Sequence, residues 1–144
     1  MTGPAPVAAI DLTEFAAIIN EARTDNNTCL LGTSLNNVPD VGLKGSMMVW
    51  DKDHLAYWER TQKESLAGLK ANPNVCVFVR NPTKDRRTLR LLGTAQVVED
   101  VATRERIWER VVQVEKDSDK EKKGLAVMIR IDRVRGGPGD LQKR

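Results

Sequence analysis

Apolar residues gather in short runs separated by turn formers, and this pattern predicts a sheet of about six short strands. Asp51-Lys52-Asp53 is one of the tight connections between runs, so consecutive strands are expected to be antiparallel. Gly45 and Gly93 interrupt two runs, and each indicates a bulge or a close backbone approach. The runs cover residues 28–34, 39–50, 54–58, 75–80, 88–98 and 125–131.

Three further segments have the apolar spacing of amphipathic helices. Residues 11–22 open with a capping box, an N-terminal oxygen-bearing side chain followed three positions later by glutamate. Residues 61–71 open with the same pattern, and Pro73 ends this second helix because proline cannot continue it. The third helix is expected over residues 103–114, and the charged run 115–123 behind it is expected to be solvated.

Strands in this order, with helices at only some connections, predict a mainly β (α+β) fold. We expect a small closed or partly closed antiparallel barrel with peripheral helices. Most connections are too short for parallel crossovers, and no GxGxxG or Walker motif occurs, so a Rossmann fold is not expected. With 144 residues the chain is interpreted as a single domain, with flexible ends at residues 1–10 and 136–144.

The composition narrows the class of protein further. Hydrophobic residues make up 40% and charged residues 30%, which is typical of a globular protein, and a net charge of +3 is too small to indicate a nucleic-acid partner. No run approaches the roughly 18 apolar residues of a membrane span, and the N-terminus lacks the basic region of a signal peptide. We therefore expect a cytoplasmic protein with no membrane partner, whose Cys29 and Cys76 are buried, reduced thiols.

Catalytic and metal-binding motifs are largely missing from the sequence. The single histidine, His54, follows a hairpin connection, where a solvent-facing histidine is ordinary. HExxH and CxxC motifs are absent, so neither a metal site nor a catalytic residue is predicted. If the protein is an enzyme, a bound cofactor is expected to carry the reaction.

The turn before the second helix has the chemistry of an anion site. A helix N-terminus presents unpaired N–H groups, and four polar side chains lie near it, from Arg60, Thr61, Lys63 and Ser65. Lys44, in a neighbouring strand, could face the same ligand. The alternative is a plain capped helix with solvated cations, in which Lys44 is an exposed edge lysine.

Several motifs in a fixed order resemble a known family. They are a P-x-x-x-x-K strand, a turn with basic and hydroxyl residues, a helix ending in L-x-x-N-P-x-V, and a glycine-centred strand. Over about residues 10–135 the chain resembles the pyridoxamine 5'-phosphate oxidase-like proteins, an FMN-binding split-barrel family. The resemblance is carried by VPDVGLKGSMMVWDKDHLAYWERTQKESLAGLKANPNVCVFVRNP, LRLLGTAQVVED and GLAVMIRIDRV.

The resemblance implies a six-stranded antiparallel split β-barrel that forms a homodimer, with FMN in clefts at the dimer interface. Lys44 would contact the phosphate or ribityl chain, Gly45 and Ser46 would let the backbone approach the ring, and Trp58 would border the flavin. The phosphate cradle would consist of Arg60, Thr61, Lys63 and Ser65. Further interface surface is expected from the apolar strand residues Met47, Val49, Val77 and Val79.

Three positions depart from the family pattern, and the first is Ser65, which stands where the family often has a lysine. Glu64 replaces a basic residue and would repel a phosphate, and Gly68 replaces an asparagine. The resemblance implies a flavin-dependent oxidoreductase with an unidentified small-molecule substrate. The alternative is a non-catalytic barrel that binds a flavin, a deazaflavin or heme. Oxidation of pyridoxamine phosphate itself is not expected, because much of the longer oxidase's substrate-binding C-terminal part is lacking.

Overall fold

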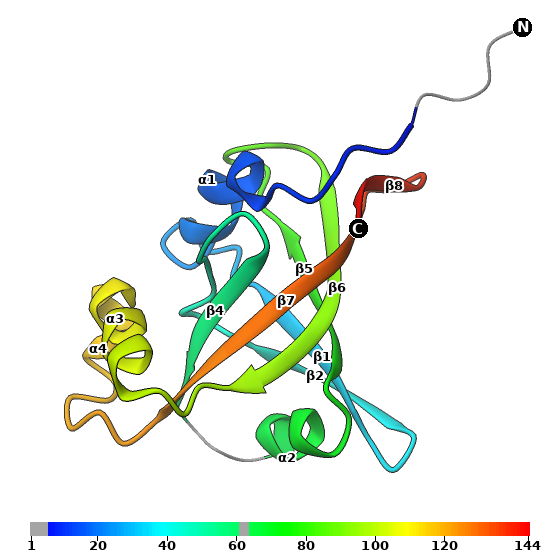
Figure 1. Cartoon of the computed structure of the whole chain (residues 1–144). Helices are drawn as coiled ribbons and strands as arrows, with labels where there is room; N and C mark the ends of the chain where they lie inside the picture. The colour runs from blue at the N-terminus through cyan, green and yellow to red at the C-terminus, as the bar shows by residue number, and fades with distance from the viewer. Residues whose placement is uncertain (1–5, 61–63) are drawn as a thin grey trace, which may run out of the picture.

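The computed structural model describes residues 6–60 and 64–144, and its strands form one curved antiparallel sheet (Figure 1). The strand order is β2-β1-β5-β6-β7-β4-β3, and β8 pairs with β7. The strands are β1 Leu30–Leu35, β2 Val38–Leu43, β3 Met48–Val49, β4 His54–Glu59, β5 Asn74–Arg80, β6 Thr88–Val97, β7 Leu125–Arg135 and β8 Asp140–Lys143.

Helices lie around this sheet, as the sequence predicts. Figure 1 shows α1 and α2 at opposite ends of the sheet, and α3 with α4 beside β4. Within the described residues, β2 and β3 end the path of paired strands, so the barrel stays open between them. The helices are the 3₁₀-helix η1 Leu12–Phe15 and the α-helices α1 Ala16–Asn20, α2 Glu64–Ala71, α3 Val101–Arg110 and α4 Gln113–Lys116.

The expected long strand over residues 39–50 is two strands at opposite edges of the sheet. β2 pairs with β1, whereas β3 pairs with β4, and a turn at Gly45 and Ser46 carries the chain across the opening. Gly93 is the bulge that the sequence predicts, because the register of β6 and β7 shifts there. A Cβ atom at Gly93 would lie 1.9 Å from the Arg130 carbonyl oxygen, so only glycine fits.

Side chains that alternate along the strands divide the core into two clusters. The main cluster lies inside the barrel and includes Leu55 and Tyr57 of β4. The second lies on the other face of β4, under α3, and includes Trp58 and Ile107. The four apolar residues that were expected to add interface surface are therefore in the core instead. Each of them is at most 5% exposed: Met47, Val49, Val77 and Val79.

Two predicted segment boundaries differ from the structure for local reasons. The helix expected over 103–114 begins at Val101 and ends at Arg110, because Val111 and Val112 have extended backbones before α4 begins. The tail expected to be loose contains β8, whose Gln142 is 2% exposed. The Gln142 side chain donates to the Asp11 carbonyl oxygen and accepts from the Asp11 amide, which ties this segment to the start of η1.

Candidate functional site

Four of the predicted site residues meet in one cleft at the opening of the barrel. We call it the seam cleft; its volume is about 300 Å³. The predicted residues in its wall are Lys44, Gly45, Trp58 and Arg60, and they come from the crossing segment after β2 and from the end of β4. The remaining lining residues are Arg23, Thr28, Leu43, Glu59 and Glu115.

Lys44 is a buried, paired lysine, so its alternative interpretation as a solvated edge residue is wrong. Its Nζ lies 2.9 Å from Glu59 Oε2 and donates to Ser65 Oγ at 2.7 Å. The side chains of Lys44 and Glu59 are 10% and 1% exposed. A buried charge needs a close partner of opposite sign, and Glu59 provides one. The sequence analysis expected Lys44 and Ser65 to face one ligand, whereas in the structure they contact each other and the Glu59 carboxylate, which the analysis missed.

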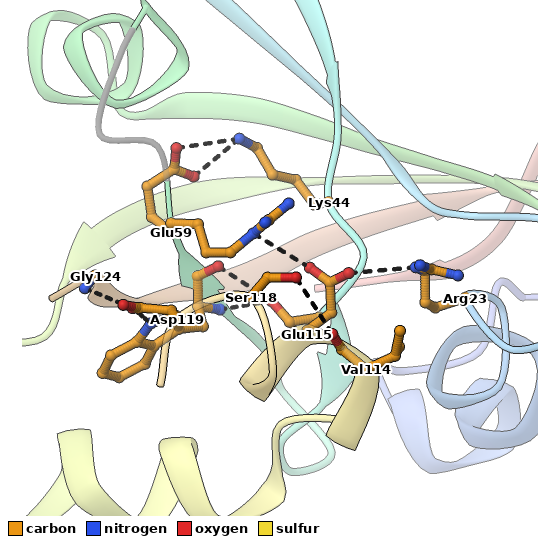
Figure 2. A network of polar contacts seen from close by, with 11 residues as sticks. Arg23, Lys44, Glu59, Val114, Glu115, Ser118, Asp119 and Gly124 are labelled. Carbon is orange, nitrogen blue, oxygen red and sulfur yellow. Dashed lines mark hydrogen bonds and ion pairs between the residues drawn. The ribbon is translucent and has the colours of Figure 1, made fainter. Parts of the chain in front are cut away.

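Arg60 and Arg23 share a second carboxylate, that of Glu115. Glu115 Oε2 lies 3.2 Å from Arg23 Nε, and Oε1 lies 3.7 Å from Arg60 Nε. Figure 2 shows Glu115 reaching from α4 toward Arg23, close to the Lys44–Glu59 pair. The Glu115 side chain is 12% exposed, whereas those of Arg23 and Arg60 are 36% and 42% exposed. The cations of the seam cleft therefore each face a carboxylate.

Gly45 lies directly beside the Glu115 carboxylate. A Cβ atom at position 45 would stand 2.6 Å from Glu115 Oε2, closer than van der Waals contact allows. The family resemblance implies that this glycine lets the backbone approach a flavin ring. In the structure, the space above Gly45 holds the end of the Glu115 side chain.

Ser46 and Trp58 are joined to each other and to the fold. Ser46 Oγ donates to the Trp58 carbonyl oxygen at 3.1 Å and accepts from the Trp58 amide at 2.8 Å. The indole Nε1 of Trp58 donates to Asp119 Oδ2 at 2.8 Å, and the ring meets Trp108 edge-on, with 4.8 Å between centroids. Trp58 is only 4% exposed, so it forms a wall of the cleft rather than an open stacking surface.

Asp119 is the residue that holds the Trp58 ring in place. Burial would raise the pKa of Asp119, but hydrogen bonds from Trp58 Nε1 and from the Gly124 and Lys123 amides lower that pKa below its usual value. The charged run 115–123 is therefore only partly solvated. Glu115 and Asp119, both within it, turn toward the sheet.

The other positions that the sequence singled out lie in or just before α2 along the chain. Thr61 and Lys63 lie outside the described residues, so the predicted cradle at the start of α2 stays a prediction. Glu64 lines a different hollow, beside the β1–β2 hairpin, together with Val38 and Pro39. At Gly68 a Cβ atom would lie 2.9 Å from Thr33 Oγ1, so glycine allows α2 to pack closely on β1.

Other chemistry is scarce in the described part of the chain. His54 is the first residue of β4, and its Nδ1 lies 2.9 Å from Asp51 Oδ1; its side chain is half-buried rather than fully facing solvent. Residues 6–60 and 64–144 contain no group of three or more side chains suited to a metal ion. The same residues include no helix long and apolar enough to cross a membrane.

Comparisons with known proteins bear on this arrangement. The model of a family described as pyridoxamine 5'-phosphate oxidase matches residues 14–136. A Lactobacillus delbrueckii protein, named as a candidate pyridoxamine 5'-phosphate oxidase, is 27% identical, with a TM-score of 0.61 over 80% of this chain and 88% of its own. No curated protein matches the chain.

Two more distant structures share the fold. HupZ of Group A Streptococcus is 19% identical, with a TM-score of 0.69 over 89% of this chain and 95% of its own. An FMN-binding protein from Syntrophomonas wolfei is 14% identical, with a TM-score of 0.63 over 86% of each chain. The predicted split barrel is thus confirmed, and residues 6–60 and 64–144 form eight strands in place of the six expected.

Proposed function

Because the chain belongs to the pyridoxamine 5'-phosphate oxidase family, we propose that it binds FMN in the seam cleft and acts as a flavin-dependent oxidoreductase. The observation that carries this proposal is the convergence of Arg23, Lys44 and Arg60 on one cleft at the opening of the barrel. The phosphate of FMN is anionic, and guanidinium groups bind phosphate through strong, directional hydrogen bonds.

The sign of the charge and the size of the cleft fit this ligand. Three cations and two carboxylates line the cleft, so its balance is positive. A volume of about 300 Å³ is at the small end of ligand pockets, enough for a phosphate and part of the ribityl chain. The isoalloxazine ring would then lie beyond the described wall. Trp58 would border it only at its edge.

The protein's own groups would bind and orient the ligand. The flavin, when bound, would accept and return the electrons. Arg23 and Arg60 are exposed enough to turn toward the phosphate, whereas the buried Lys44–Glu59 pair would shape the floor beside it. No histidine is among the described residues that line the seam cleft, which is in keeping with chemistry carried by the cofactor.

A second candidate is a non-catalytic barrel that binds a flavin, a deazaflavin or heme. It is supported by the pairing of Lys44 with Glu59 and of Arg60 with Glu115, which leaves the cleft charges largely compensated. Steady-state turnover of a reduced nicotinamide or a reduced deazaflavin by the flavin-loaded protein distinguishes the two. Turnover supports the oxidoreductase, and tight flavin binding without turnover supports the binding protein.

Flavin titration tests the location of the phosphate. Arg60→Ala should weaken FMN about ten- to a hundredfold, because a charge-assisted hydrogen bond contributes about 1.5–3 kcal/mol. Riboflavin, which lacks the phosphate, should bind both proteins alike. Arg86→Ala, in the exposed loop after β5, is the matched control. Equal FMN affinity in the wild type and Arg60→Ala would place the phosphate elsewhere.

We also propose that the chain forms a homodimer, through the outer face of β2, β1 and β5. Val41 and Leu43, which share the outer face of β2, are 63% and 68% exposed, and such exposure is unusual for two apolar residues side by side on one face. The strand register extends this surface in two rows. One contains Val41, Gly32, Cys76 and Leu92, and the other contains Leu43, Leu30 and Phe78.

Light scattering at micromolar concentration tests the dimer. Val41→Lys should produce monomers, because it places a charge on the outer apolar face, at the β2 end of one of its two rows. Val101→Lys is the matched control, since Val101 is equally exposed, at 70%, but lies on α3. A monomeric wild type with flavin bound, or a Val41→Lys protein that remains dimeric, would contradict the proposed surface.

A further inference from the structure

We infer that Glu115 is an internal competitor for the anion site, a specificity-determining residue that must leave Arg23 and Arg60 before a phosphate binds them. This inference rests on the proposed function, because it concerns the same cleft. Among the charged groups of the seam cleft, Glu115 alone comes from α4, a helix of four residues. The sequence gives no signal for this contact.

The position of the carboxylate is that of a bound anion. Its two oxygens lie 3.2 Å from Arg23 Nε and 3.7 Å from Arg60 Nε, so a single group bridges both guanidinium groups. It also stands over Gly45, where a Cβ atom would be 2.6 Å away. A phosphate bridging the same two arginines would therefore overlap the carboxylate. Both groups cannot occupy the site together.

Of the two carboxylates in the cleft, Glu115 is the one that can yield. Glu59 is 1% exposed and bonded to Lys44 through both oxygens, and separating a buried pair is costly. The arginine partners of Glu115 are 36% and 42% exposed, and pairs with such exposed partners contribute little. The longer contact, to Arg60, is the weaker of its two ion pairs. Ligand charge would therefore displace Glu115 and leave Lys44–Glu59 intact.

This arrangement selects among ligands by charge. A neutral ligand such as riboflavin gains nothing from displacing the carboxylate, so its affinity does not depend on Glu115. A phosphate carries close to two negative charges and replaces a carboxylate that carries one, so its attraction to the two arginines is stronger than that of the group it displaces. The affinity of the protein for FMN is therefore set below what Arg23 and Arg60 alone would provide.

Replacing the carboxylate by its neutral isostere tests the inference. Glu115→Gln should tighten FMN about tenfold, the effect of removing one competing charge-assisted contact, and should leave riboflavin unchanged. Glu109→Gln, the same substitution at an exposed position of α3, is the control and should bind both like the wild type. FMN affinity of Glu115→Gln within about twofold of the wild type, or equal tightening of riboflavin, overturns the inference.

Two further measurements keep the outcome clear. Glu115→Asp shortens the side chain by one methylene and should bind FMN with intermediate affinity; if the glutamine variant does not fold, an aspartate variant no tighter than the wild type overturns the inference. Inorganic pyrophosphate, followed by thermal unfolding, probes the anion site without a flavin. If no protein binds flavin, the proposed function fails, but a larger pyrophosphate shift in Glu115→Gln still supports the competitor and an unchanged shift refutes it.

Discussion

Breaking the Lys44–Glu59 ion pair should destabilise the fold rather than selectively lower the affinity for a phosphate-bearing ligand. In Lys44→Met the ammonium that lies 2.9 Å from Glu59 Oε2 is lost, while the carboxylate stays 1% exposed beside Ser65. Removing one partner of a buried ion pair costs about 3–5 kcal/mol. A domain of this size shifts its midpoint by about 2–4 °C per kcal/mol, so we expect a loss of about 6–20 °C.

A double-mutant cycle in thermal and urea unfolding isolates the pair. Lys44→Met with Glu59→Gln removes both charges and should recover most of the stability lost in the single variant, because two neutral groups no longer require each other. In Lys44→Met the affinities for FMN and for riboflavin should fall together, whereas in Arg60→Ala only the affinity for FMN should fall. A single variant within about 1 kcal/mol of the wild type, or additive changes in the cycle, would refute the reasoning.

Three other predictions follow from the described contacts. Glu64→Lys should change FMN affinity less than about twofold, because Glu64 lines a hollow away from the seam cleft. Because the pKa of Asp119 is lowered in the folded state, its carboxylate stabilises the protein at pH values above the usual pKa of 3.8. That stability is lost as the pH falls through the folded-state pKa. Acid should therefore shift Trp58 emission in the wild type and much less in Asp119→Asn. Burial raises the pKa of Cys29 to about 12 and also raises that of half-buried Cys76, so a thiol reagent at pH 8 should label Cys76 slowly and leave Cys29 unmodified.

Each of these outcomes has a measurement that would contradict it. Tightened FMN in Glu64→Lys would mean that this carboxylate does face the ligand. An emission change at the same acid pH in the wild type and in Asp119→Asn would assign the transition to another group. Labelling of Cys29 at the rate of Cys76 would show that the barrel interior opens readily.

Much of the fold could be predicted because strand patterns are local. The run 75–80 is β5 Asn74–Arg80, and the run 54–58 is β4 His54–Glu59, since alternation and turn formers are sufficient to place them. The split between β2 and β3 was missed because an apolar run does not reveal which partner each half takes. Only the complete sheet decides that the two halves belong to opposite edges.

The site could be predicted only in part, because motif order is local information whereas the pairing of its charges is not. Lys44 and Arg60 were placed together from motif order, yet their carboxylate partners were not. Glu59 could have been found, because the period of two along β4 places it on the inward face with Leu55 and Tyr57. Glu115 could not, since its position depends on the extended backbone before α4 and on how the chain then folds back.

The crossing at Gly45 has a consequence for how the protein folds. It joins the two edge strands, β2 and β3, so the seam cleft exists only when both edges of the sheet are in place. Contacts that need distant parts of a chain close large loops and tend to form late. Arg23, Lys44, Arg60 and Glu115 should therefore come together in the last stage of refolding, and anion binding should appear only with the fully assembled barrel.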